Sequence, residues 1–217
     1  ACSLMMHANN ALSHTPPQTW KCYAALGAQG AKTSNISSGP SVSAVQSYMI
    51  DSGANNAKTL GHRRWILSHG LGPIGIGGTS AQGSSCLTVI GGTGKFSRNF
   101  TAWPAPGPFP LQAVSGGGSV GLDQTGWSVQ TDQVNLGTST VTVRANGQAL
   151  PVQTTVLGQG YGAKYALSFK PVGWKSEPGV TYTVSVDKVG ASPWTYDVQM
   201  IDCAAFSRRY QLSPSGS

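Results

Sequence analysis

Apolar and polar residues follow two different periods along the chain. Near the start, apolar residues recur every three or four positions, which predicts a helix with one buried face; they are Ala1, Leu4, Met5, Ala8, Ala11 and Leu12. A second helical pattern runs from about Ser43 to Asp51, with one apolar side made of Val42, Val45, Tyr48 and Met49. Gly53 is the expected residue just past the end of that helix. We expect the short apolar runs at residues 65–67 and 74–77 to be strands.

Beyond residue 110, apolar residues alternate with polar ones, as they do in a strand with one buried face. The alternation is clearest at Val180–Asp187, Thr140–Arg144 and Thr195–Met200. Asn146-Gly147, between two such stretches, is a strong signal for a type I′ hairpin turn. Several strands at this spacing, with no helical pattern among them, predict an antiparallel, immunoglobulin-like β-sandwich of about 100 residues.

A proline-rich stretch separates the two patterns. Four prolines lie between Trp103 and Pro110. Because each fixes φ and removes a backbone donor, the stretch is excluded from an interior helix or a central strand. We therefore expect an α+β protein with a mixed domain at residues 1–102, a linker at 103–118 that includes glycines 116–118, a β-sandwich at 119–205 and a tail at 206–217.

Composition adds a compartment and a charge to this picture. Only 10% of the residues are charged, against about 25% in ordinary soluble domains, which is typical of extracellular proteins. No apolar run is long enough to span a bilayer, and no signal-peptide core is present, so we expect a secreted chain whose export signal has been removed. The net charge is +7, and residues 1–100 hold seven lysines and arginines against one acid, Asp51. That half should attract anionic surfaces, whereas the lack of a basic helix or an aromatic RNA-binding motif argues against nucleic acid.

The four cysteines, Cys2, Cys22, Cys86 and Cys203, are an even number without CxxC spacing. This spacing argues against a zinc knuckle or a thioredoxin site and for two disulfides, with three possible connectivities. We favour Cys2–Cys22 as a local bond and Cys86–Cys203 as a long-range one. The alternative is four buried free thiols in a cytosolic protein.

The residues that could perform chemistry do not form a known catalytic motif. The four histidines are His7, His14, His62 and His69, and neither HExxH nor GxSxG occurs in the chain. Six aromatic residues could stack on sugar rings if exposed, although such residues more often form cores; they are Trp103, Trp127, Trp174, Trp194, Tyr161 and Tyr165. Composition and spacing alone therefore indicate only a secreted two-domain protein.

Four segments, in the right order over the first hundred residues, resemble bacterial SCP-like proteins of the CAP superfamily. Residues 4–14 and 20–23 resemble the start of that domain, and Thr33-Ser34-Asn35-Ile36 resembles its Gly-Glu-Asn-(Ile/Leu) segment. Tyr48-Met49-Ile50-Asp51 is similar to its aromatic-x-x-acid segment. The last match is Gly61-His62-Arg63-Arg64-Trp65, followed by Ile74-Gly75-Ile76-Gly77, which resembles Gly-His-Tyr-Thr-Gln and a later Gly-x-Gly. Domains like the predicted sandwich follow CAP domains in some bacterial proteins.

This resemblance implies an α-β-α sandwich whose central cleft holds two histidines and two acids and, in several members, a divalent metal. Carried over by position, these are His14, His62 and Asp51, while the first acid is replaced by Ser34. Two imidazoles and one carboxylate with an open position could hold Zn²⁺, because catalytic zinc sites commonly use three protein ligands plus water. The alternative is that the two histidines only form hydrogen bonds across the cleft.

Residues next to this motif are candidates for ligand binding. Ser34 and Asn35 fall in the family's Gly-Glu-Asn segment, and Arg63 and Arg64 next to His62 could bind an anionic group, although paired arginines are usually only solvated. The family's first helix has no counterpart in the sequence. One interpretation is that the chain is processed by proteolysis, with that segment lost or held separately. The other is that this member of the family is naturally short at its N-terminal end.

Three functions fit these expectations. The first is a secreted binding protein whose cleft, with or without a metal, engages a lipid, a sterol or a cell-wall polymer. The second is a zinc-dependent hydrolase of peptides or glycans that uses His14, His62 and Asp51. The third is an adhesin that binds through the β-sandwich.

Overall fold

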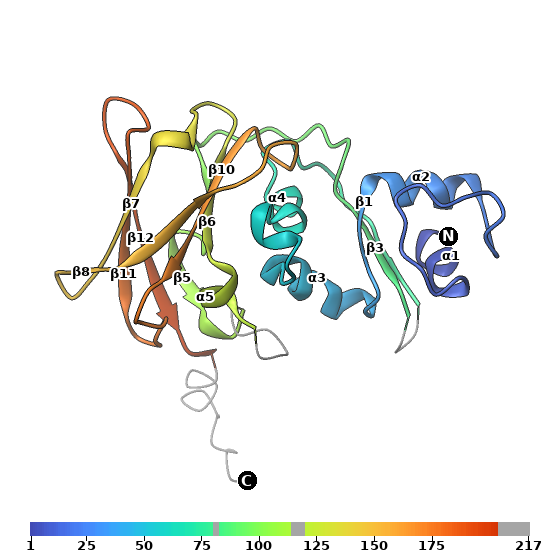
Figure 1. Ribbon diagram of the computed structural model, residues 1–217, viewed down its shortest axis with the longest axis horizontal. Coiled ribbons are helices and arrows are strands. Elements are labelled where there is room, and N and C mark those ends of the chain that lie inside the picture. Colours follow the sequence, from blue (N-terminus) through green and yellow to red (C-terminus); the bar gives the residue numbers. More distant parts are fainter. Residues whose placement is uncertain (80–82, 114–119, 204–217) are drawn as a thin grey trace, which may run out of the picture. The chain divides into compact units, whose positions relative to one another are not determined.

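The protein has the expected mixture of helices and strands and belongs to the α+β class (Figure 1). The computed structural model describes residues 1–79, 83–113 and 120–203, without the side chains of Ser41 and Val42. Two compact units make up the chain. The first consists of Ala1–Thr101, Gln130–Gln133 and Leu157–Ala166. The second consists of Ala102–Val129, Val134–Val156 and the residues from Leu167 onward. The predicted tail at 206–217 and glycines 116–118 lie outside the described residues.

The first unit is built on a small antiparallel sheet with the strand order β1-β3-β2. Its strands are β1 (Ser34–Ser37), β2 (Ile76–Gly78) and β3 (Ser85–Thr88). Its helices are α1 (Cys2–Ala8), α2 (Ala25–Thr33), α3 (Ser41–Ile50), the 3₁₀ turn η1 (Asn56–Lys58) and α4 (Gly61–Ile66). Helices α1 and α2 lie on one side of the sheet, and α3 and α4 lie on the other (Figure 1).

Each side of this sheet has its own apolar cluster. On the α1–α2 side, Trp20 and Ile36 pack against a buried group made of Cys2, Met6, Ala31 and Cys86. On the α3–α4 side, Trp65 and Ile66 pack against Ala44, Tyr48, Leu87 and Val89. The two clusters stabilise a layered unit that buries apolar surface on both faces of the sheet.

The predicted N-terminal helix is present but shorter than its pattern, because α1 ends at Ala8. Its buried side chains are those of Cys2, Ser3, Met5 and Met6. Leu4, which was expected on the buried face, is 50% exposed, and Leu12 lies beyond the helix and is 43% exposed. The adjacent methionines, both fully buried, determine which face is buried.

The second predicted helix is confirmed as α3, with bounds close to those expected. It ends at Ile50, and Asp51 follows with a left-handed φ of 55°. The expectation that Gly53 comes just past the helix end was therefore wrong. The prediction of a strand at residues 65–67 was wrong, because Trp65 and Ile66 are the last residues of α4. The predicted strand at residues 74–77 corresponds in part to β2.

One disulfide joins α1 to the sheet, and it differs from both predicted pairs. Cys2 on α1 is bonded to Cys86 on β3, whereas Cys22 and Cys203 are exposed thiols. The bond forms here because both cysteines belong to the buried cluster between α1 and β3. The pairs Cys2–Cys22 and Cys86–Cys203 were therefore wrong.

The second unit contains two sheets. One has the order β4-β6-β10-β9, made of β4 (Thr101–Trp103), β6 (Trp127–Thr131), β10 (Tyr165–Pro171) and β9 (Val152–Val156). The other has the order β5-β12-β11-β7-β8, made of β5 (Gly107–Pro110), β12 (Trp194–Ile201), β11 (Thr181–Asp187), β7 (Thr140–Ala145) and β8 (Gln148–Leu150). Short helical turns occur at η2 (Leu111–Ala113), α5 (Leu122–Thr125) and η3 (Leu136–Thr138).

The predicted strands of this unit are confirmed as β7, β11 and β12. Asn146 and Gly147, both with positive φ, form the two-residue turn between β7 and β8. Trp127 on β6 contacts Phe169 in its own sheet and Tyr182 on β11 of the other sheet, so the two sheets share an aromatic core. Within the proline-rich stretch, β5 is an edge strand that pairs in parallel with β12.

In the part of the chain that the structure describes, no helix is long and apolar enough to cross a membrane.

Candidate functional site

The first unit contains a pocket of about 350 Å³ in which both motif histidines meet. This volume lies within the range of about 300–1,000 Å³ that is usual for small-molecule sites. The twelve lining residues are His14, Lys32, Ser34, Asn35, Asn55, Asn56, Thr59, Gly61, His62, Trp65, Ile90 and Tyr161. All of them belong to the first unit. Four of them were candidate site residues in the sequence, and Tyr161 was one of the aromatic residues considered for stacking on sugars.

Asp51 and His62 form a hydrogen-bonded pair at this pocket. The Nδ1–H of His62 donates to Oδ1 of Asp51 over 2.8 Å. The carboxylate is fully buried, and its Oδ2 accepts from the backbone N–H of Arg63. A carboxylate held in this way fixes the ring orientation and the tautomer of its histidine. Nε2 is then the ring nitrogen left to act as an acceptor or a base, since no described residue bonds to it.

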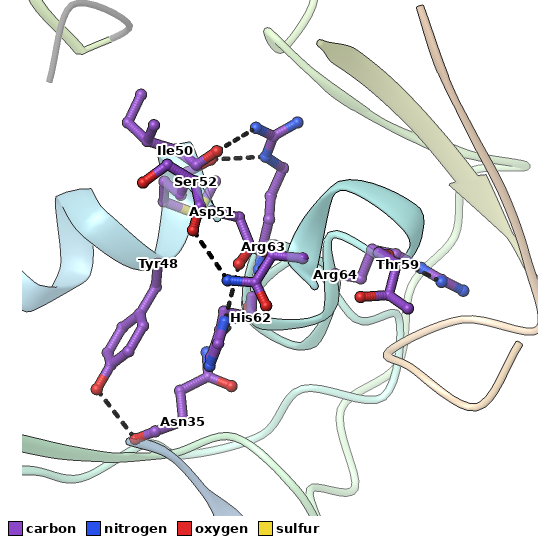
Figure 2. Close-up of polar contacts among 11 residues, drawn as sticks. Asn35, Tyr48, Ile50, Asp51, Ser52, Thr59, His62, Arg63 and Arg64 are labelled. Carbon is purple, nitrogen blue, oxygen red and sulfur yellow. Dashed lines mark hydrogen bonds and ion pairs between the residues drawn. The ribbon is translucent and has the colours of Figure 1, made fainter. Parts of the chain in front are cut away.

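The His62 ring and backbone are also held by residues of the sheet and of α3 (Figure 2). The ring stacks on Tyr48, with ring centroids 5.3 Å apart. The side-chain amide of Asn35 donates to the His62 carbonyl over 2.9 Å. The Tyr48 hydroxyl donates to the Asn35 carbonyl over 3.1 Å, and burial raises the pKa of this tyrosine. Tyr48 and Asn35 therefore use these groups to position His62 and not to bind a ligand.

His14 reaches the same pocket from the chain that follows α1. Its Nδ1–H donates to the carbonyl of Ala31, at the end of α2, over 2.8 Å. This bond fixes the tautomer that leaves Nε2 available. Both motif histidines thus use Nδ1 for a protein acceptor and keep Nε2 for a ligand.

Helix α4 owes its position to an unusual backbone. Leu60, just before the helix, has a left-handed φ of 46° and ψ of 44°. Such a conformation is uncommon for a bulky residue and is maintained only by strong local packing. Leu60 is fully buried against Leu157 and Ala166, which supplies that packing. This turn places Gly61 and His62 at the pocket.

The donors at the pocket do not make up the expected zinc site. Asp51, the expected third ligand, uses both carboxylate oxygens for His62 and Arg63. Among the described residues, no group of three or more His, Cys, Asp or Glu side chains is placed to hold a metal ion. Two imidazole nitrogens are fewer than the three protein ligands of a usual catalytic zinc site. We therefore derive no catalytic step from a metal.

The two arginines after His62 do not line the pocket. Both side chains are buried, with exposed fractions of 0% for Arg63 and 1% for Arg64. Arg63 donates to the carbonyls of Met49 and Ile50 at the end of α3. Burial lowers the pKa of each arginine to about 10, and the Asp51 carboxylate partly offsets this for Arg63. The structure thus gives both arginines protein partners in place of the expected anionic ligand.

The two remaining predicted site residues, Ser34 and Asn35, both lie at the pocket and also bond to the protein. Ser34 lines the pocket, and its hydroxyl lies 3.3 Å from that of Thr88 on β3. Asn35 also lines the pocket, although its amide is used to hold His62. Sequence reasoning missed Lys32 at the end of α2 and Asn55, Asn56 and Thr59 around η1, because single polar residues carry no periodic signal.

Comparison of the chain with family models, with curated proteins and with solved structures finds no match. The function therefore has to be argued from the pocket and from the sequence resemblance.

Proposed function

We propose that the first unit is a secreted, CAP-like binding module whose pocket holds an anionic, polyhydroxylated ligand of the cell-wall polymer class. The observation that carries the proposal is the convergence of His14 and His62 on one pocket, each with Nδ1 bonded to the protein. Rings fixed in this way present Nε2 to a ligand without losing side-chain entropy on binding.

The chemistry of the lining favours a glycan over a lipid or a sterol. Eight of the twelve lining residues have polar side chains, and Ile90 is the one aliphatic side chain among them. A lipid site is lined mainly by apolar groups. Amides and hydroxyls such as those of Asn55, Asn56 and Thr59 instead match the donors and acceptors of a sugar.

The charge of this region favours an anionic ligand. Lys32 lies in the lining, and residues 1–100 carry six more positive than negative charges at neutral pH. The one negative charge, that of Asp51, is buried and bonded to His62, so it opposes an anionic ligand only weakly. A carboxylated or phosphorylated glycan would be attracted, and its approach should weaken with salt.

Two features support the resemblance to CAP domains and the secreted location. The first unit has helices on both sides of its sheet (Figure 1), as the resemblance implies. The Cys2–Cys86 disulfide favours an oxidising compartment, because cytosolic thiols are normally kept reduced.

The proposal is tested by calorimetry with soluble peptidoglycan fragments, which are polyhydroxylated and carry carboxylates. We expect saturable binding to the wild type that is lost in the His14→Ala/His62→Ala double variant and weakened by salt. Neutral dextran and phosphatidylglycerol vesicles are the comparison ligands. Tighter binding of the vesicles than of the fragments, or equal binding by the double variant, would contradict the proposal.

A Zn²⁺ titration of the same two proteins near pH 7.5 tests the metal expectation. A metal ion binds an imidazole through a ring nitrogen that carries no proton. Stoichiometric binding that disappears in the double variant would show that two imidazoles suffice to hold Zn²⁺. Equal binding to both proteins would place any bound Zn²⁺ elsewhere.

Hydrolysis in the same pocket is a second candidate, favoured by the His62–Asp51 pair. A histidine backed by a buried carboxylate is the usual arrangement of a general base, which here would take a proton from water at Nε2. Turnover of peptidoglycan fragments that is lost in His62→Ala but unaffected by chelator would support a metal-free hydrolase. Chelator-sensitive turnover would instead support the zinc-dependent reaction.

A further inference from the structure

The pocket has one wall that comes from far along the chain. The segment Leu157–Ala166, hereafter the strap, belongs to the first unit, and its Tyr161 lines the pocket with His62. We infer that Tyr161 is a ligand-contacting residue for the sugar ring and that Arg64 is the residue that positions it. The inference rests on the proposed glycan function and adds to it a binding group outside the resemblance to CAP domains.

Tyr161 is partly exposed, and its hydroxyl is available for a hydrogen bond to a ligand. The residue is half-buried, and no described residue bonds to its hydroxyl. A tyrosine in a pocket offers a sugar both a flat apolar face and a polar tip. The Tyr161 ring lies against Gly61, where a Cβ atom would come within 2.7 Å of its Cδ1. The ring is therefore fixed directly beside His62.

Arg64 holds the strap by its backbone. Its guanidinium donates to the carbonyls of Gly158 and Ala163, two strap residues that flank Tyr161. Its Cζ also lies 5.8 Å from the centroid of the Tyr161 ring. A planar guanidinium can make such paired bonds in fixed directions, and a lysine ammonium cannot reproduce them. This explains why a charged side chain with 1% exposure is placed next to a binding pocket.

Two further contacts seat the strap on α4 and the residues after it. The hydroxyl of Ser68 donates to the carbonyl of Gly162 over 2.6 Å. Gly162 has a left-handed φ of 55°, and a Cβ there would lie 1.9 Å from the Arg64 carbonyl oxygen. Any larger residue would push the strap away. The backbone of the strap is thus held closely enough to act as a fixed wall.

The test measures binding of soluble peptidoglycan fragments by calorimetry, with the fold of each variant checked by circular dichroism. Tyr161→Ala should weaken binding about tenfold or more, as loss of an aromatic anchor usually does, and Tyr161→Phe should weaken it about two- to tenfold by removing one hydrogen bond. Tyr165→Ala is the matched control, because Tyr165 is a half-buried strap tyrosine that does not line the pocket. Equal affinity of wild type and Tyr161→Ala would overturn the inference while leaving the proposed function intact.

A double-mutant cycle tests the positioning role of Arg64. Arg64→Lys should weaken binding in the wild-type background and have no further effect in the Tyr161→Ala background, because its action passes through Tyr161. Additive losses would show a general structural role and overturn the assignment of Arg64. If Arg64→Lys does not fold, Arg64→Gln replaces it in the same cycle.

Gly61→Ala provides a test that leaves both proposed residues unchanged. The added methyl group should displace the Tyr161 ring and weaken binding, whereas Gly75→Ala, where a Cβ meets nothing within 4 Å, should not. Equal affinity of these two variants would contradict the inference. No binding of the fragments by the wild type would overturn the proposed function and, with it, this inference.

Discussion

At the scale of single residues, His69 is a histidine that the fold keeps neutral. Its ring stacks on Phe96 at 4.3 Å, and its Nε2 is buried without a hydrogen-bond partner among the described residues. Burial lowers the pKa of His69 below its usual value of 6.5, and the carboxylate of Asp132, 3.4 Å from Nδ1, only partly offsets this. A proton on Nε2 would therefore be a buried N–H without an acceptor, on a ring whose charge Asp132 compensates only in part.

We expect acid to destabilise the protein through His69. Because the folded state binds this proton less readily than the unfolded state, the free energy of unfolding should fall as the pH drops through about 6.5 and below. Urea unfolding between pH 8 and pH 5 should show a steeper loss in the wild type than in His69→Gln. His7→Gln, at an exposed position on α1, controls for the loss of a histidine. Equal pH slopes for the wild type and His69→Gln would rule out this origin.

At the scale of elements, Arg63 joins the start of α4 to the end of α3. Its guanidinium bonds the carbonyls of Met49 and Ile50, which the helix itself leaves without partners. A cation at this end of a helix also meets the negative end of its dipole. The buried Asp51 carboxylate also acts on this guanidinium and partly offsets the lowering of its pKa by burial.

Replacing Arg63 should therefore cost far more than a surface change. Arg63→Met removes the bonds to the Met49 and Ile50 carbonyls and leaves these buried acceptors unpaired, which should lower the free energy of unfolding by about 2 kcal/mol or more. Urea denaturation followed by circular dichroism measures it. Lys21→Met, at an exposed position, is the control and should change stability by less than about 0.5 kcal/mol. If Arg63→Met also lost less than about 0.5 kcal/mol of stability, the arginine would not be needed for the fold.

The elements also show what the sequence could and could not predict. Strands β7, β11 and β12 were predictable because one buried face leaves a period of two, and the Asn146-Gly147 turn is specified by two residues that accept positive φ. Helix α4 was not, because its six residues are too few to show a period and its start depends on the buried Leu60. At the site, His14 and His62 were placed together by resemblance, whereas Tyr161 depends on a contact far along the chain that no local pattern encodes.

At the scale of the whole molecule, the two units are not two consecutive stretches of the sequence. The first unit takes in Gln130–Gln133 and the strap, which the alternating pattern assigned to the sandwich. Gln130 uses its side-chain amide to bond the carbonyls of Arg64 and Leu67, so this segment satisfies polar groups of α4. The pocket therefore needs residues from both halves of the chain, although its two motif histidines come from the first.

The single disulfide provides the last test, because it links positions 84 residues apart within the first unit. A crosslink over a loop of this length restricts the unfolded chain and stabilises the fold by about 4.5 kcal/mol in the chain-entropy description. Thiol titration of the unreduced, denatured protein should find two free thiols, those of Cys22 and Cys203, and four after reduction.

Cys2→Ser/Cys86→Ser should lower the urea midpoint, while Cys22→Ser should leave it unchanged because that side chain is exposed. Four thiols before reduction, or an equal loss in Cys22→Ser, would contradict this bond and weaken the argument for an oxidising compartment.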